Sequence, residues 1–429
     1  MMKKWLIAAL CLLMLVLPAC TPAEQIPTTN APTQVATQEP TQAATEATTE
    51  ATEPTEPVNL NWKTNVLRSD ELSYQGDFWE WADEAANYPV FGSEYTRAQI
   101  RSVTFVNSLS QAPGDAWDVS ANGNCAVMAW VEPEGPRYNL YIGADGGINA
   151  ADACVDLFAG YQNMISIDFG ASFHTDEALY MSRMFLGCGA LRELDLSQFD
   201  TSVVWNMDQM FDGCRSLTSL DVSGFDTSSV MTMFWMFHLC DSLKTLDLSS
   251  WNTGNVTDMT EMFASCSELE SLDLSGWNTS NVYSMNGMFH SCNALKALDL
   301  SSFDTGNVVD MWGMFCWCGS LKELDVSSFD TRNVTTMCAM FSDCSELTEL
   351  DVSCFDTSNV TTMYSMFSGC RKLTELDVSN FDTSNVTSMM YMFDGCPCVT
   401  IDDVRHFDTD KVNEYSYFMN GDDWKFLFK

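Results

Sequence analysis

The sequence predicts an α/β solenoid, a right-handed stack of short parallel strands and short helices with a mixed, β-rich cap at its N-terminal end. The first observation is a Met-Phe pair that recurs nine times at an interval of 26 residues, from Met184 to Met392, with no insertion. The second is that each repeat joins an alternating apolar segment to a segment with helical spacing. Self-similarity at a fixed period indicates stacked units, because an insertion would interrupt their shared core.

One clean repeat begins at Leu321. In residues 321–327, Leu324 and Val326 alternate with polar side chains, which predicts a short strand with one buried face. Turn-forming residues follow, up to Asn333. Parallel strands joined in this way favour right-handed crossovers.

The second half of the repeat has apolar residues at offsets of 0, 3, 6, 7 and 10, which form one stripe of a short helix: Val334, Met337, Met340, Phe341 and Cys344. Neighbouring strands lie about 4.8 Å apart, whereas packed helices need about 10 Å. A full layer of helices would therefore force strong curvature, and because the expected helices are short we predict an arc or a gently curved rod rather than a closed ring.

Identical residues of successive repeats should form columns. One is aromatic: Phe199, Phe225, Trp251, Trp277, Phe303, Phe329, Phe355, Phe381 and Phe407. A second consists of asparagines, whose amides can bond to the backbone of the adjacent turn: Asn255, Asn281, Asn307, Asn333, Asn359 and Asn385.

The phrase Leu-Asp-Leu-Ser-x-Phe-Asp-Thr-x-Asn-Val-x-x-Met-x-x-Met-Phe-x-x-Cys resembles the 26-residue repeat of bacterial surface lipoproteins, which are grouped with the BspA-like leucine-rich-repeat surface proteins. The resemblance covers about residues 165–412. It implies a leucine-rich-repeat-like solenoid displayed on a cell surface, with a role in adhesion or interaction and no catalytic residues.

The N-terminal 58 residues predict a membrane tether. Residues 1–19 combine two lysines with a short apolar run and are typical of a signal peptide. Leu17-Pro18-Ala19-Cys20 resembles a lipobox, which makes Cys20 the expected lipidation site. An ordinary signal peptide or an uncleaved anchor is the alternative. Residues 20–58 are rich in Thr, Pro, Ala and Glu and predict a disordered tether.

Residues 59–164 predict an N-terminal cap. The segment 99–106 resembles a strand, and 126–131 with 138–142 predict a hairpin around Glu134-Gly135-Pro136. Residues 156–161 echo the repeat one residue out of period, so the cap should grade into the solenoid of residues 165–412. A separate ligand-binding module is the alternative for 59–164. Residues 413–429 are expected to form a C-terminal cap.

Charge argues against nucleic acid and anionic lipid as partners. The chain has 59 acidic and 20 basic side chains and a net charge of −39, or about −41 after loss of Lys3 and Lys4 with the signal peptide. Much of it lies in two aspartate columns, which include Asp325 and Asp330. A solvated face with turn capping is the favoured interpretation, and calcium binding is the alternative.

Cysteine and histidine positions predict neither a metal site nor catalysis. Each repeat supplies one column cysteine, such as Cys344, which we interpret as a small buried thiol. Bridging depends on whether adjacent turns lie about 5 or 10 Å apart. His238 and His290 share a repeat position but lie two repeats apart. We find no catalytic motif and expect no enzyme and no cofactor.

Large aromatic residues at variable positions are the candidate binding residues, because exposed aromatics are enriched at recognition surfaces. They are Trp205, Phe234, Trp235, Tyr283, Trp312, Trp317, Tyr364 and Tyr391. Lateral packing between turns is the alternative.

These observations predict a bacterial surface protein that is held at the outer face of the membrane only by its N-terminal lipid. We expect it to bind an extracellular protein in adhesion or protein–protein interaction. A glycan-binding lipoprotein that captures polysaccharide is the alternative.

Overall fold

The computed structural model describes residues 64–70, 72, 84–400 and 403–408. The chain divides into two compact units, Met1–Val58 and Asn59–Lys429, and the following description concerns the second. The expected signal peptide, lipidation site and tether, and the C-terminal cap, lie outside the described residues. Within the described ranges, no helix has the length and apolar character needed to span a bilayer.

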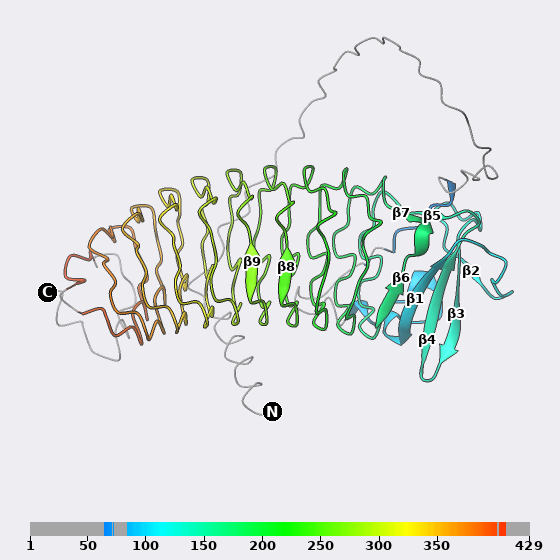
Figure 1. Cartoon of the computed structure of the whole chain (residues 1–429), viewed down its shortest axis with the longest axis horizontal. Coiled ribbons are helices and arrows are strands. Elements are labelled where there is room, and N and C mark those ends of the chain that lie inside the picture. Colours follow the sequence, from blue (N-terminus) through cyan, green and yellow to red (C-terminus); the bar gives the residue numbers. More distant parts are fainter. Residues whose placement is uncertain (1–63, 71, 73–83, 401–402, 409–429) are drawn as a thin grey trace, which may run out of the picture. The chain divides into compact units, whose positions relative to one another are not determined.

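The N-terminal region is built on a mixed five-stranded sheet, as predicted (Figure 1). Its strand order is β2 (Trp117–Asp118), β3 (Met128–Glu134), β4 (Arg137–Gly143), β1 (Ile100–Val106) and β6 (Ser166–Asp168). β3 and β4 form the predicted antiparallel hairpin, whereas β1 runs parallel to both β4 and β6. Because β6 belongs to the first degenerate repeat, the sheet continues into the repeats rather than ending as a separate module.

Short elements complete the described secondary structure. Three 3-10 helices are η3 (Val90–Gly92), η4 (Arg97–Gln99) and η5 (Gly170–Ser172). Two further parallel pairs join β5 (Ile148–Asn149) to β7 (Phe173–His174), and β8 (Thr245–Asp247) to β9 (Ser271–Asp273).

The repeats form coils that lie side by side in one row (Figure 1). A parallel bridge joins each coil to the next, and from Tyr180 to Ser388 the paired residues are 26 apart. The first step, from Ala153 to Tyr180, is 27 residues, so the echo at residues 156–161 is itself a coil. The 26-residue stack is therefore confirmed, and it begins upstream of residue 165.

The predicted short helices are wrong. Within residues 153–400, the helix-spaced segment is a run of turns and contains no α-helix. Phe341 N–H donates to Met366 in the next coil, whereas Cys344 N–H donates to Phe341 in its own coil. Two residues per coil, for example Ala339 and Asp343, have positive φ of 53° and 56°, which breaks helical geometry.

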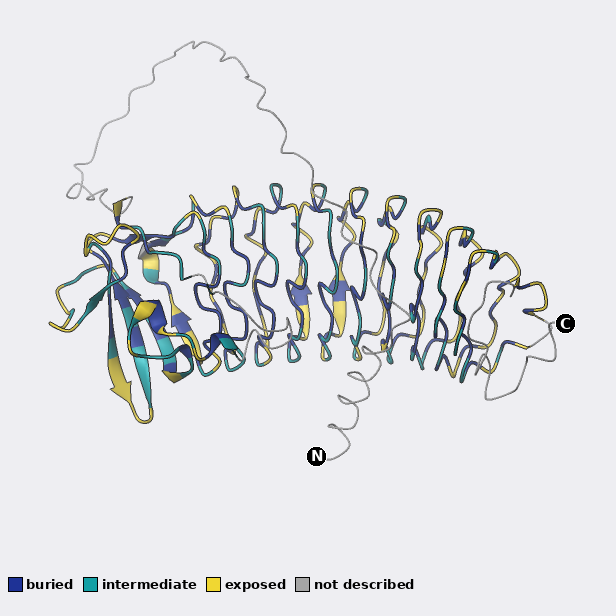
Figure 2. Cartoon of the chain, turned by 180° about the vertical axis from the view of Figure 1, so that it is seen from behind, coloured by how far each residue is buried: buried dark blue, intermediate teal, exposed yellow. Residues whose placement is uncertain are grey.

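The spacing between coils explains this correction. The phenylalanines of the Met-Phe pairs stack from Phe185 to Phe393, with centroid separations of 5.5–5.7 Å. An α-helix with side chains is about 10 Å wide and does not fit at this spacing. Turns that alternate between internal and inter-coil hydrogen bonds do fit. The apolar stripe is buried as predicted, because Val334, Met337 and Met340 are fully enclosed. Figure 2 shows that buried and exposed stretches alternate along the coils.

Ladders of side-chain hydrogen bonds join the coils. Each predicted asparagine donates to a backbone carbonyl of the preceding coil at 2.7 Å, which confirms that column. The predicted aromatic column is also confirmed, with Trp251 and Trp277 stacked 6.5 Å apart. Each column cysteine is a free, buried thiol, and Cys344 Sγ donates to the Phe315 carbonyl at 3.1 Å.

A threonine column was not recognised in the sequence. Thr331 is buried, its hydroxyl donates to the Asp356 carbonyl at 3.0 Å and it accepts from Asp356 N–H at 2.8 Å. The same exchange recurs from Thr175 to Thr383, so it includes both degenerate end repeats. The threonine of each turn thus binds two coils together.

A buried arginine joins the N-terminal region to the first coil. Arg97 is fully buried and donates to the carbonyl oxygens of Asp156 and Ala159, at 2.8 and 2.7 Å. Its guanidinium also pairs with Asp70 at 2.8 Å. Next to it, Gly160 has a φ of +74°, and a Cβ there would lie 2.4 Å from the Ala85 carbonyl carbon. The N-terminal region and the first coil are therefore closely packed against each other at Gly160.

Candidate functional site

Exposed apolar side chains gather in one column of the stack. The position that follows the buried valine of each coil, or Ala178 in the first degenerate repeat, carries Leu179, Trp205, Met231, Tyr283 and Val309, which we name the apolar column. Leu179, Met231, Tyr283 and Val309 are 36–49% exposed, and Trp205 is half-buried. Four of the seven exposed large hydrophobic residues in the described ranges therefore occupy this single position.

Backbone hydrogen bonds hold the apolar column in register. Met231 N–H donates to Trp205 and Tyr283 N–H donates to Thr257, both at 2.9 Å. The column is interrupted by Thr257 and continues as threonine in later coils, at Thr335, Thr361 and Thr387. The same position in the repeat thus carries mostly apolar side chains in the earlier coils and threonine hydroxyls in the later coils.

Carboxylates flank the apolar column. The Tyr283 hydroxyl donates to Asp258 at 2.9 Å, and burial together with that carboxylate raises the pKa of the tyrosine. Burial also raises the pKa of Asp208 and of Asp310. Asp208 accepts hydrogen bonds from Thr232 and from the backbone of Phe234. The rim of the column is therefore acidic and internally hydrogen-bonded.

The eight predicted aromatic residues do not form one surface. Only Tyr283 and Trp317 are exposed, at 49% and 36%. Five are half-buried: Trp205, Phe234, Trp312, Tyr364 and Tyr391. Trp235 is only 5% exposed, so the expectation that it lies on the surface is wrong. Its positive φ turns the indole onto His238, with ring centroids 4.3 Å apart.

Lateral packing, the alternative for these aromatics, accounts for several of them. Tyr364 meets Tyr391 edge-on at 5.8 Å, and Trp312 stacks on His290 at 6.2 Å. The aliphatic members of the apolar column were missed, because we considered only aromatic side chains. Their signal was available as the residue after the repeated valine, where Met231 and Val309 replace threonine.

The aspartate columns are exposed and take part in turns. Asp221 accepts from both the hydroxyl and the backbone N–H of Ser223, and these bonds lower the pKa of its carboxyl. Asp356 makes the same pair of bonds with Ser358 at the second column. Across the residues that the structure describes, no group of three acidic, histidine or cysteine side chains is placed to hold a metal ion.

One charged cluster lies beneath the surface. His238 Nδ1 lies 2.8 Å from Asp212 Oδ1, and its Nε2 lies 3.9 Å from Glu261 Oε2. Burial raises the pKa of Glu261 to about 7, against the opposing effect of His238. Burial also lowers the pKa of His290 to about 4. The cluster can hold a proton, but within the described residues no hydroxyl or thiol bonds to His238 as a nucleophile would.

The coils, their ladders and the apolar column define a tandem-repeat protein. The chain belongs to the family described as "Mycoplasma protein of unknown function, DUF285", whose model matches residues 153–264, 240–324 and 318–425. No curated protein matches the sequence.

Among solved structures, the chain is similar to one titled "Crystal structure of TLR13-ssRNA13 complex". The two are 17% identical with a TM-score of 0.27, and the match covers 62% of this chain and 38% of that one. A similarity of this size carries no argument about fold or function.

Proposed function

We propose that this chain is a bacterial surface lipoprotein that binds an extracellular protein through the apolar column. The observation that supports the proposal is the concentration of exposed apolar side chains at one position of otherwise polar coils. Exposed apolar side chains concentrated at one place on a surface are typical of interaction sites. The N-terminal signal, the lipobox cysteine and the tether would place the stack outside the cell.

Charge at the rim defines the kind of partner. Asp208, Asp258 and Asp310 lie beside the apolar column, and the chain as a whole is strongly acidic. A protein segment with apolar side chains rimmed by lysine and arginine complements both properties. We therefore propose adhesion or protein–protein interaction without catalysis and without a cofactor.

A binding screen tests the proposal. The full chain carrying Cys20→Ala, to prevent lipidation, would be tested against extracellular-matrix proteins and mucins, with and without calcium. For a protein that binds, a triple variant with Met231→Ser, Tyr283→Ser and Val309→Ser should weaken binding by about tenfold or more.

The matched control uses the same ladder. Thr335→Ala, Thr361→Ala and Thr387→Ala change the same position in later coils, and binding should stay within about threefold. Equal loss in both triple variants would place the ligand elsewhere. Loss of binding on chelation would support calcium at the aspartate columns.

A further inference from the structure

The few basic side chains of the stack are gathered at one corner. Residues 153–400 contain nine lysines and arginines, and seven of them lie within four residues after a column cysteine. We name this segment the basic corner, with members Arg192, Arg215, Lys244, Lys296, Lys322, Arg371 and Lys372. The corner extends from the column cysteine to the residue after the first leucine of Leu-x-x-Leu, and it is distinct from the position of the apolar column.

Several members of the basic corner form an ion pair with an acidic side chain of a neighbouring coil. Lys296 lies 2.6 Å from Glu270, Lys372 lies 2.6 Å from Glu346, and Arg215 lies 2.9 Å from Asp241. The hydrogen bond from Lys296 lowers the pKa of Glu270. Three members, Arg192, Lys322 and Arg371, differ, because no carboxylate of the described residues lies within 4 Å of their charged groups.

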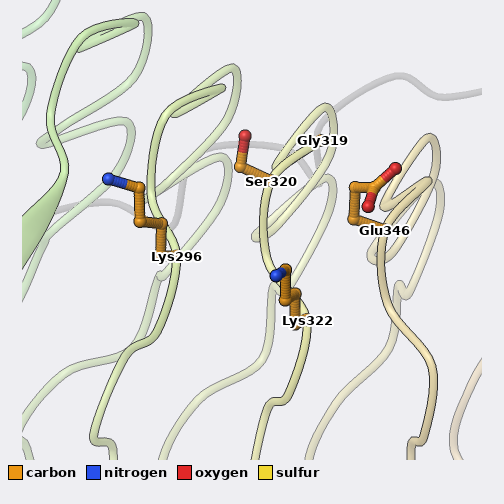
Figure 3. A pocket seen from close by; sticks show the side chains of 5 residues that line it. All are labelled: Lys296, Gly319, Ser320, Lys322 and Glu346. Carbon is orange, nitrogen blue, oxygen red and sulfur yellow. The ribbon is translucent and has the colours of Figure 1, made fainter.

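Lys322 lines a surface recess of about 510 Å³. Lys296, Gly319, Ser320 and Glu346 complete its lining, and Figure 3 shows them on three neighbouring coils. Lys296 and Lys322 occupy the same position in adjacent coils, where side chains of a parallel ladder lie about 5 Å apart. Lys296 is already paired with Glu270, and Glu346 also lines the recess, so Lys322 supplies the positive charge that an anion in the recess would meet.

An exposed aromatic residue lies on the coil that carries Gly319, Ser320 and Lys322. Trp317 is 36% exposed and precedes Gly319 by two residues, which limits the Cα separation to about 7 Å. Trp317 has a φ of +63°, as do, within a few degrees, the equivalent residues of the neighbouring coils. The equivalent position is Ser291 in the coil before and Asp343 in the coil after, so the aromatic is particular to this coil.

We propose that this recess binds an acidic saccharide. Its carboxylate or sulfate group would pair with Lys322 and accept a hydrogen bond from the Ser320 hydroxyl, while a pyranose face packs on Trp317. The ligand carries one or a few negative charges, because a long polyanion would be repelled by a chain of net charge −39. The site is separate from the apolar column and does not depend on it.

Calorimetric titration of the full chain carrying Cys20→Ala tests this site. The probes are 3′-sialyllactose for the carboxylate, 3′-sulfolactose for the sulfate, neutral lactose and inorganic sulfate. At least one acidic sugar should bind saturably and about tenfold more tightly than lactose, and binding should weaken as salt rises. Lys322→Ala should weaken it by about tenfold, and Trp317→Ala by a similar factor.

Arg332→Ala is the matched control. Arg332 is an exposed cation that pairs with Asp330 in its own turn, and it lies outside the basic corner. The Arg332→Ala variant should bind the acidic sugar with the affinity of the parent protein, and so should the apolar-column triple variant. Thermal melts of all variants would show whether the fold is retained.

Several outcomes would overturn the proposal. Binding of lactose as tightly as of the acidic sugars would remove the role of Lys322. Equal affinity for inorganic sulfate would mean an adventitious ion only. Identical behaviour of Lys322→Ala and Arg332→Ala would move the site elsewhere, and tighter binding of an acidic peptide would replace the saccharide as ligand.

Discussion

The N-terminal region and the coil stack bury their cores in different ways. In the N-terminal region, β1, β3 and β4 pair along seven-residue strands, and one buried arginine makes several bonds that occur nowhere else in the described chain. In the stack, each core residue contacts copies of itself, as Phe289 does with Phe263 and Phe315, both at 5.7 Å. The same packing arrangement is thus repeated from coil to coil in the stack, whereas the contacts in the N-terminal region each occur once.

This difference predicts how far a destabilising substitution affects the rest of the molecule. Coils contact only their neighbours, so the stability of the stack is close to a sum of coil and interface terms. A defect in a middle coil should separate the coils on either side, whereas a defect in the N-terminal sheet should leave distant coils intact.

The largest expected effect comes from Phe289→Ala, in the middle of the phenylalanine column. The change removes a fully buried ring and two ring contacts, which should cost about 3–5 kcal/mol of unfolding free energy. Urea unfolding should show a lower midpoint and a second transition. Phe105→Ala in β1 is the comparison, with hydrogen exchange expected to rise mainly in the N-terminal region. Identical exchange patterns for the two variants would refute nearest-neighbour stability.

A smaller effect is expected at the joint of the two regions. Gly160→Ala places a Cβ within 2.4 Å of Ala85 at positive φ, which should destabilise by about 2–4 kcal/mol. Gly213→Ala has the same φ of +74° at the equivalent position of a later coil, but its nearest neighbour is 3.4 Å away. It should cost only about 1 kcal/mol. Chemical denaturation compares the two, and equal costs would mean that the close contact at the joint relaxes freely.

The smallest effect depends on pH. Burial raises the pKa of Glu261 from 4.5 to about 7, so the folded state favours the protonated carboxyl. The group therefore lowers the free energy of unfolding progressively as pH rises from about 4.5 to about 7, by roughly 1–3 kcal/mol. Glu261→Gln should flatten this dependence and be the more stable protein at pH 8.

Asp212 and His238 face Glu261, so the unfolding free energies of the parent protein and of Glu261→Gln are compared at several pH values. Glu268→Gln changes an exposed carboxylate in the same coil and should leave the pH profile unchanged. Parallel profiles for the parent and Glu261→Gln would show that Glu261 is not the titrating group.

The sequence by itself determined the period, the buried faces and the columns. Leu324 and Val326 are buried, and Asn333 donates to the preceding coil, because a fixed register brings equal positions together. The hairpin around Gly135 was likewise predictable from alternation and turn residues. These features depend on local spacing, which the sequence states directly.

Only the tertiary structure decided the backbone of the second half of each repeat and the surface that it presents. The spacing of Val334, Met337 and Phe341 fits a helix, but coils about 5.7 Å apart leave no room for one. Turns with positive φ at Ala339 and Asp343 replace it, and they decide which side chains face solvent. Trp235 is buried and Met231 is exposed for this reason, since both depend on turns that form only when neighbouring coils supply the hydrogen bonds.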